Sequence, residues 1–157
     1  MLALAWAYAR WSDDHVTITR KPIESVHAAD GDSFSIGKRK LRLTGLDAPE
    51  YSQVCKDAGG RDWDCGKAAQ GALISLLAQP GLSCETDAAD KYGRALAICK
   101  TAATPDIAGA QVAAGMAVSN EFYGLRDYGD EEDAARDARR GIWQGAFIHP
   151  KEWRRTH

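Results

Sequence analysis

Several features that would point to a function at once are missing from this chain of 157 residues. The formal net charge is −2 at pH 7, so the surface as a whole does not attract nucleic acid, and a site for a polyanion must be a local patch. No apolar run approaches the roughly 20 residues of a membrane span, because the first one, MLALAWAYA, stops at Arg10. No repeat, low-complexity segment or linker divides the chain, which predicts a single domain with its own core.

The apolar start of the chain also lacks the basic residues that open a signal peptide. Two interpretations stay open: the end of an export or anchor sequence that begins upstream, or a short helix that covers part of the core. We therefore divide the chain into an apolar segment, residues 1–15, and a domain, residues 16–157. No stable membrane span is expected within this chain.

The four cysteines favour two disulfides over a zinc site, since there is no CxxC pair and no histidine at ligand spacing. Cys84 and Cys99 are equally far from the midpoint of the turn sequence DKYG, so a hairpin places them opposite one another, within disulfide range. Cys55 and Cys65 then close a small glycine-containing loop. Disulfides indicate an oxidising compartment, and we expect a periplasmic or secreted protein, tethered to a membrane if the apolar segment extends upstream.

Alternating apolar and polar residues predict five strands, the first of them interrupted at Lys21-Pro22. Three helices are expected, the last of which has acidic residues in its first turn, basic residues in its last turn and Gly141 as its C-terminal cap. An α+β fold follows, a five-stranded OB-fold-type β-barrel with about three α-helices. The expected strands are 16–28, 33–36, 40–44, 82–86 and 94–100, and the expected helices are about 64–78, 105–115 and 130–140.

The hairpin with its turn at Gly37-Lys38 brings opposite charges together. Pairing the apolar residues of its two strands sets Arg42 across from Ser33, with Asp32 one step along. A slip or a bulge would instead oppose Asp32 to Arg42 directly, and this alternative stays open. An arginine between two leucines of a half-apolar strand needs a carboxylate or a bound anion as its partner.

The residues around this hairpin suggest a divalent metal site that faces an anionic substrate. Asp32 and Asp47 are hard oxygen ligands suited to calcium or magnesium, and waters with a backbone carbonyl near Ala48 would complete the shell. Glu50 is placed to hold a water as general base. Arg94 follows the second hairpin turn, from which it can reach the same site and help to clamp a phosphate.

Three motifs in this chain, DGDS at 30–33, RLTGLDAPE at 42–50 and DKYGRALA at 90–97, resemble the three-part signature of the thermonuclease, or staphylococcal-nuclease-like, family. The similarity runs from about Ile23 to Trp143. It implies a calcium-dependent nuclease that hydrolyses phosphodiester bonds of DNA and RNA with low sequence specificity and leaves 3′-phosphate and 5′-hydroxyl ends. It also implies catalytic roles for Arg42, Glu50 and Arg94, and calcium ligation by Asp32, Asp47 and the Ala48 carbonyl.

Contacts with the substrate are expected from Lys91, Tyr92 and Tyr123. Glu121 stands where the resemblance would place a tyrosine, and a carboxylate there would repel phosphate and remove a stacking partner. The alternative to an active nuclease is therefore a catalytically weak or inactive module that binds nucleic acid or a protein partner. In either case we expect a monomer.

Overall fold

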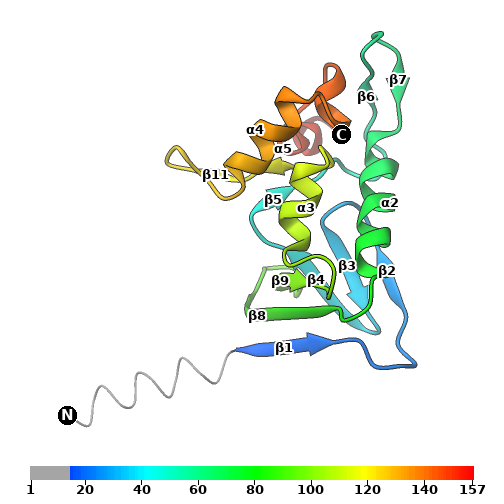
Figure 1. Ribbon diagram of the computed structural model, residues 1–157, viewed down its shortest axis with the longest axis vertical. Coiled ribbons are helices and arrows are strands. Elements are labelled where there is room, and N and C mark those ends of the chain that lie inside the picture. Colours follow the sequence, from blue (N-terminus) through cyan, green and yellow to red (C-terminus); the bar gives the residue numbers. More distant parts are fainter. Residues whose placement is uncertain (1–14) are drawn as a thin grey trace, which may run out of the picture.

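The computed structural model describes residues 15–157, and its centre is a curled six-stranded sheet (Figure 1). The strands run in the order β1-β8-β9-β4-β3-β2, and all neighbours are antiparallel except β4 and β9, which are parallel. The α+β class and the OB-like architecture are thereby confirmed. The strands of this sheet are β1 (Val16–Thr19), β2 (Val26–Ala28), β3 (Ser33–Ile36), β4 (Arg39–Leu43), β8 (Ser83–Ala89) and β9 (Ala95–Lys100).

The prediction of one interrupted first strand was wrong, because β1 and β2 lie at opposite edges of the sheet. β1 pairs with β8, whereas β2 pairs with β3. A turn between them, closed by a hydrogen bond from the Glu24 amide to the Lys21 carbonyl, surrounds Pro22 and redirects the chain. The sheet consequently has one strand more than expected.

Four α-helices occur in the described part of the chain, one more than the sequence predicts. The predicted helices correspond to α2 (Cys65–Leu77), α3 (Ile107–Ala113) and α4 (Gly129–Asp137). The additional one, α5 (Pro150–Thr156), follows a short 3₁₀ helix, η1 (Gly141–Gln144). Within the described residues, no helix has the length and apolar character that crossing a membrane requires.

The main core fills the space between the sheet and the helices α2 and α3 (Figure 1). Apolar side chains that alternate along β3 and β4 enter it, as their pattern predicts, and Ile36, Leu41 and Leu43 are almost fully buried. A second small cluster contains Cys55, Cys65 and Ile142, with Trp143 and Phe147 packed against it. This cluster attaches the segment after α4 to the body of the protein.

The last predicted helix ends earlier than expected, at Asp137, and Ala138 caps it. Arg139, two residues after the end of the helix, adopts a left-handed backbone conformation (φ 53°), and Gly141 is left-handed as well (φ 54°). Gly141 also allows a close backbone approach: a Cβ on it would lie 2.1 Å from the Gly115 carbonyl oxygen, so only a glycine lets these two segments touch. The Ile142 amide donates to the same carbonyl.

Short two-stranded ribbons hold the loops around this body. β5 (Leu46–Asp47) pairs with β10 (Val118–Ser119), and β6 (Cys55–Lys56) pairs with β7 (Asp62–Trp63). The sequence predicts an irregular connection over 120–130, but the chain forms a further hairpin there, β11 (Glu121–Phe122) with β12 (Leu125–Arg126). This hairpin projects from the body beside α4 (Figure 1).

Both expected disulfides are present in the structure, Cys84–Cys99 and Cys55–Cys65. Cys84 lies directly opposite Cys99 in the β8–β9 ladder, as expected, although the pairs beside the turn are one residue out of that register and a bulge between Thr86 and Ala88 restores it. The first disulfide thus stabilises the hairpin whose turn leads to Arg94. The second closes the ribbon that follows Glu50.

Candidate active site

Asp32 and Arg42 form the buried centre of the candidate site. The structure has the expected register, with Arg42 opposite Ser33. Asp32 precedes β3 and is only 2% exposed. Its Oδ1 accepts hydrogen bonds from Arg42 Nη1 (3.0 Å) and from the Ser33 hydroxyl (3.1 Å), and its Oδ2 accepts one from the Ala48 amide (2.8 Å). Asp30 is a turn residue, whose carboxylate accepts from two backbone amides.

These hydrogen bonds do not fully compensate the burial of Asp32. Desolvation raises the pKa of the Asp32 carboxyl to about 7, and the neighbouring Asp30 carboxylate adds to the effect, although Arg42 opposes it. The negative charge of the Asp32 carboxylate is therefore only partly compensated by the positive groups around it. A cation that approached the Asp32 carboxylate would be stabilised there.

Arg94 reaches this centre through the Ser33 hydroxyl. Its Nη1 donates to Ser33 Oγ (3.1 Å), and that hydroxyl donates in turn to Asp32. The Arg94 Nε donates to Asp90 (2.7 Å), which also accepts from the Arg94 backbone amide and so fixes the side chain against its own turn. The β8–β9 turn thus places a second arginine beside the centre formed by Asp32 and Arg42.

Asp47, the last residue of β5, and Glu50, on the loop after it, bind an arginine that the sequence reasoning missed. Arg154 on α5 donates from Nη1 and Nη2 to the two oxygens of Asp47, each at 2.8 Å, and from Nη1 to Glu50 Oε1 at 3.0 Å. Arg42 Nη2 lies 3.7 Å from the Asp47 carboxylate. No sequence pattern marked Arg154 as a site residue, because it is one of several basic residues in KEWRR and its partners are more than a hundred positions away.

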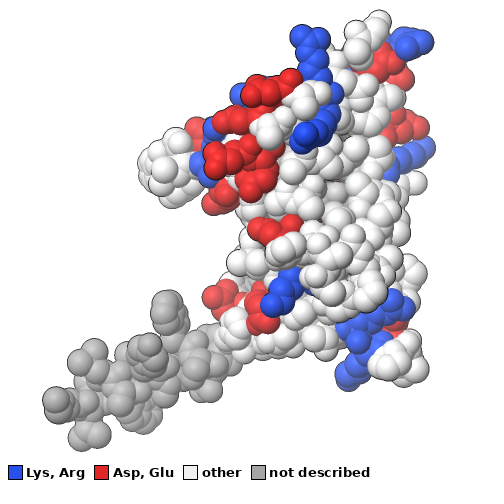
Figure 2. Space-filling view, viewed as in Figure 1, with Lys and Arg blue, Asp and Glu red and all other residues white. Residues whose placement is uncertain are grey.

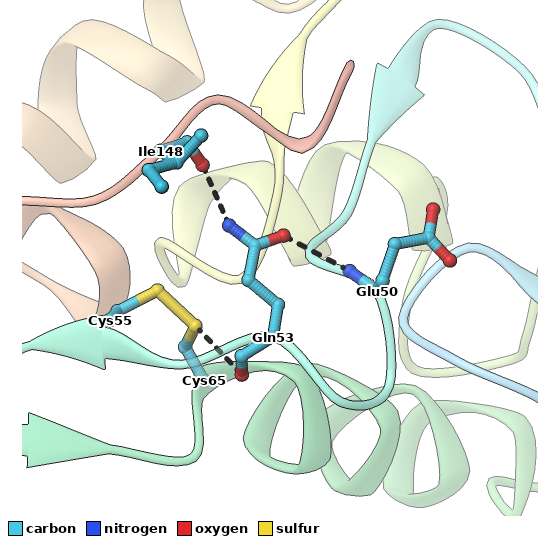
Figure 3. Close-up of a disulfide and its surroundings, with 5 residues drawn as sticks. All are labelled: Glu50, Gln53, Cys55, Cys65 and Ile148. Atoms are coloured by element: carbon cyan, nitrogen blue, oxygen red, sulfur yellow. Dashed lines mark hydrogen bonds between the residues drawn. A yellow bond between two sulfur atoms is a disulfide. The ribbon is translucent and has the colours of Figure 1, made fainter. Parts of the chain in front are cut away.

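The loop that carries Glu50 is held by Gln53, which is buried (Figure 3). The Gln53 side-chain oxygen accepts from the Glu50 amide (3.3 Å), and its side-chain nitrogen donates to the Ile148 carbonyl (2.6 Å). The Gln53 carbonyl oxygen lies 3.4 Å from Cys65 Sγ, beside the disulfide with Cys55. The buried residue Gln53 thereby contacts the Glu50 loop, the disulfide and the segment that leads into α5.

Helix α2 also restricts the position of this loop. A Cβ on Gly66, in the first turn of the helix, would lie 1.8 Å from the Glu50 carbonyl oxygen, so the loop rests directly on the helix backbone. The Gly66 amide donates to the Gln53 carbonyl (3.1 Å). Glu50 therefore has a well-defined backbone position, while its side chain is one-third exposed and accessible from outside.

The expected substrate contacts lie on two separate hairpins. Lys91 and Tyr92 occupy the β8–β9 turn, where the Lys91 amine and the Arg94 guanidinium lie 5.2 Å and 5.5 Å from the centre of the Tyr92 ring. Tyr123 lies at the tip of the β11–β12 hairpin, 91% exposed and packed edge-on against Phe122. The structure thus groups the first two with Arg94 and leaves Tyr123 on its own projection.

The surface beside Asp47 is rich in acidic residues. Asp47 and Glu121 line one pocket of about 630 Å³, into which Arg126 and Lys151 also reach. Figure 2 shows acidic side chains gathered over α4, whose first turn contains Asp130, Glu131 and Glu132. The candidate site therefore presents its positive charge to a polyanion through Arg42, Arg94 and Lys91.

Asp32, Asp47 and the Ala48 carbonyl match calcium in chemical type, since all three are hard oxygen donors. The undercompensated charge of Asp32 also fits a cation. Among residues 15–157, however, no three side chains of His, Cys, Asp or Glu are grouped closely enough to hold a metal by themselves. Water, a backbone carbonyl or substrate oxygens would have to complete the shell, and in this structure both Asp47 oxygens are bonded to Arg154.

A comparison with known protein families shows to which family the chain belongs. The family described as staphylococcal nuclease homologue matches residues 40–145, which is most of the chain. The chain belongs to this family. Its matched part contains Arg42, Asp47, Ala48, Glu50 and Arg94, whereas Asp32 and Arg154 lie outside it.

A curated relative of this staphylococcal nuclease homologue is the succinoglycan biosynthesis protein ExoI of Rhizobium meliloti (strain 1021). The two are 34% identical over 121 residues, which cover 76% of this chain and 63% of the relative. The chain therefore spans less than two thirds of that relative's length. The name of the relative refers to succinoglycan biosynthesis, whereas the description of the family refers to a nuclease.

Proposed function

We propose that this staphylococcal nuclease homologue is a calcium-dependent nuclease that hydrolyses phosphodiester bonds of DNA and RNA with low sequence specificity. The observation that carries the proposal is the connected group of Asp32, Arg42 and Arg94 around the Ser33 hydroxyl, with Asp47 and Glu50 on the adjoining loop. Two carboxylates and two arginines meet there, the groups that a hydrolase of phosphodiesters needs.

Each residue has a distinct part in this proposal. Arg42 and Arg94 bind the scissile phosphate and stabilise the charge that develops on it in the transition state. Glu50, with its exposed carboxylate on a fixed backbone, accepts a proton from the attacking water. Asp32, Asp47 and the Ala48 carbonyl would hold the calcium ion, which supplies further charge stabilisation at the phosphate when it is bound. Lys91, Tyr92 and Tyr123 contact the substrate outside the reacting centre, and the products carry 3′-phosphate and 5′-hydroxyl ends.

The test is the degradation of plasmid DNA and of a structured RNA by the purified, oxidised protein, with millimolar calcium or with a calcium chelator. We expect degradation in calcium and none with the chelator. Intact substrates under both conditions would overturn the proposal. End-group analysis of the fragments checks the position of the phosphate.

A second candidate is a module that binds nucleic acid or a protein partner without cleaving. The acidic surface over α4 and the carboxylate of Glu121 in the pocket beside Asp47 favour it. The name of the relative, which states no nuclease activity, favours it as well. The change Glu50→Gln separates the two candidates, because a binding module would retain its affinity and a nuclease would lose its rate.

The setting of the protein is part of the proposal. Two disulfides support an oxidising compartment, either the periplasm or the exterior, with tethering to a membrane if the apolar segment 1–15 extends upstream. That segment lies almost entirely outside the described residues, and the domain at 16–157 acts as one unit. We propose that it acts as a monomer, which size-exclusion chromatography with light scattering can check.

A further inference from the structure

Arg154 is bound to the same atoms that the proposed cation requires. Its guanidinium forms a two-pronged contact with Asp47, one nitrogen to each carboxylate oxygen, and one of these nitrogens also donates to Glu50. Such planar pairs are the strongest ion pairs that arginine makes. The Asp47 and Glu50 carboxylates also raise the pKa of Arg154, so it carries its charge at every relevant pH.

The helix that carries Arg154 is fixed mainly at its start. Before α5, the Ile148 carbonyl accepts from Gln53 and the Ala146 carbonyl accepts from the Lys56 amide. Within α5, Pro150 is buried and His149 caps the first turn by accepting from the Lys151 amide. The remaining side chains of the helix are largely exposed, and Arg155 pairs with Glu152 of the same helix rather than with the site.

The C-terminal part of α5 is therefore linked to the site through the side chain of Arg154. Arg154 itself is 39% exposed, so water can replace its hydrogen bonds when it leaves. Arg42, in contrast, belongs to the central sheet and stays with Asp32 when Arg154 moves. A cation that binds Asp47 competes directly with Arg154, which is hydrogen-bonded to both Asp47 oxygens, whereas Arg42 Nη2 lies 3.7 Å from this carboxylate.

We propose that Arg154 is an internal cation that competes with the divalent ion for Asp47, so that ion binding releases α5 from the site. The proposal rests on the calcium dependence put forward under Proposed function. Because a guanidinium and a divalent ion cannot share both Asp47 oxygens, each weakens the binding of the other by the same factor. Arg154 thereby sets the divalent concentration at which the site is filled.

The first experiment measures calcium affinity by isothermal titration calorimetry, without substrate, for the unaltered protein, Arg154→Gln and Arg155→Gln. Arg155 is the matched control, because its removal changes the net charge equally and affects the same helix. We expect Arg154→Gln to bind calcium about fivefold more tightly, as the loss of a partly exposed ion pair implies. Arg155→Gln should bind like the unaltered protein.

Equal affinity in Arg154→Gln and Arg155→Gln would overturn the competition while leaving the calcium site intact. Absence of calcium binding in all three proteins, up to millimolar concentrations, would overturn the competition together with the calcium part of the proposed function. The two failures are therefore distinguishable.

A second experiment needs no variant. Hydrogen exchange of the unaltered protein, followed by mass spectrometry, reports the opening of α5 directly. We expect faster exchange of the amides of residues 151–156 in saturating calcium than in chelator, and unchanged exchange in the central sheet. Unchanged or slower exchange over 151–156 in calcium would overturn the proposal.

Discussion

Arg42 and Arg154 approach the Asp47 carboxylate from two different parts of the molecule. Arg42 belongs to β4, a strand hydrogen-bonded on one side to β3 and on the other to β9. Arg154 belongs to the seven-residue α5, which is attached to the body through the residues just before it. The backbone of the first arginine is fixed by two ladders, whereas the second is held at the site by its own side-chain contacts.

The candidate active site therefore has a fixed part and a releasable part. The fixed part consists of Asp32, Ser33, Arg42 and Arg94, which are linked by hydrogen bonds on or beside the disulfide-bonded sheet, and we expect it to keep its geometry when a ligand binds. The releasable part is α5 with Arg154. Asp47 and Glu50 lie between the two, with their backbone in the fixed part and their side chains bonded to the releasable one.

The largest effect is expected from Glu50→Gln, which leaves both arginines in place. If Glu50 activates water, the cleavage rate at saturating calcium should fall by about 10²–10⁴-fold. Substrate affinity should change little, since the phosphate contacts remain. Initial rates on a short fluorescent oligonucleotide measure this, with Glu131→Gln on the exposed acidic turn of α4 as the control. A rate within threefold of the unaltered protein, by our choice of threshold (about 0.7 kcal/mol), would contradict the role of Glu50.

The next comparison concerns how much Arg42 and Arg154 each contribute to the free energy of unfolding. Arg42→Met leaves Asp32 buried without its main partner, and we expect a loss of about 3 kcal/mol, at the low end for a buried pair because Asp32 can take up a proton. Arg154→Met breaks a pair that is partly exposed, and we expect a change below about 1 kcal/mol. Urea unfolding at pH 7 measures both. Equal losses would show that the distinction between the fixed and the releasable part is wrong.

The fixed part is the part that the sequence predicts. Alternation of Phe34 and Ile36 with Leu41 and Leu43 sets the register of β3 and β4, and it brings Arg42 to Ser33 as expected. This register follows from short-range periodicity, in which one slipped residue would turn every apolar side chain away from the core. The pairing of Cys84 with Cys99 was also predicted correctly, but the symmetry about the turn does not explain it alone, because a bulge between Thr86 and Ala88 shifts the register by one residue.

The releasable part depends on contacts that periodicity does not reveal. α5 is too short to show an apolar stripe, and Arg154 meets partners that lie 104 and 107 positions earlier. The β11–β12 hairpin escaped prediction for a different reason. A non-glycine residue, Tyr123, takes a positive φ of 51° in its turn, just before Gly124, and the typical hairpin turn sequences are absent.

The two disulfides offer a third comparison, because each supports a different part. Replacing either pair by alanines removes a cross-link over 15 or 10 residues, and we expect a loss of about 3 kcal/mol for each. Only the pair Cys55→Ala/Cys65→Ala should also speed hydrogen exchange over residues 151–156, since that disulfide lies beside Gln53. Thermal unfolding and hydrogen exchange measure the two effects. Faster exchange of α5 after loss of Cys84–Cys99 would contradict the division.

The last comparison concerns Gln53, whose buried side-chain amide joins the Glu50 loop to the residues before α5. Gln53→Met keeps the volume but leaves the Ile148 carbonyl and the Glu50 amide without their partner, and we expect a loss of about 1–2 kcal/mol. Because the start of α5 is then held less firmly, exchange over residues 151–156 should rise even without calcium. Gln70→Met is the control: Gln70, in the middle of α2, donates to the Ala28 carbonyl of β2, so its loss should lower stability without affecting α5. If both variants left α5 unchanged, Arg154 alone would hold the helix, and the releasable part would be a single side chain.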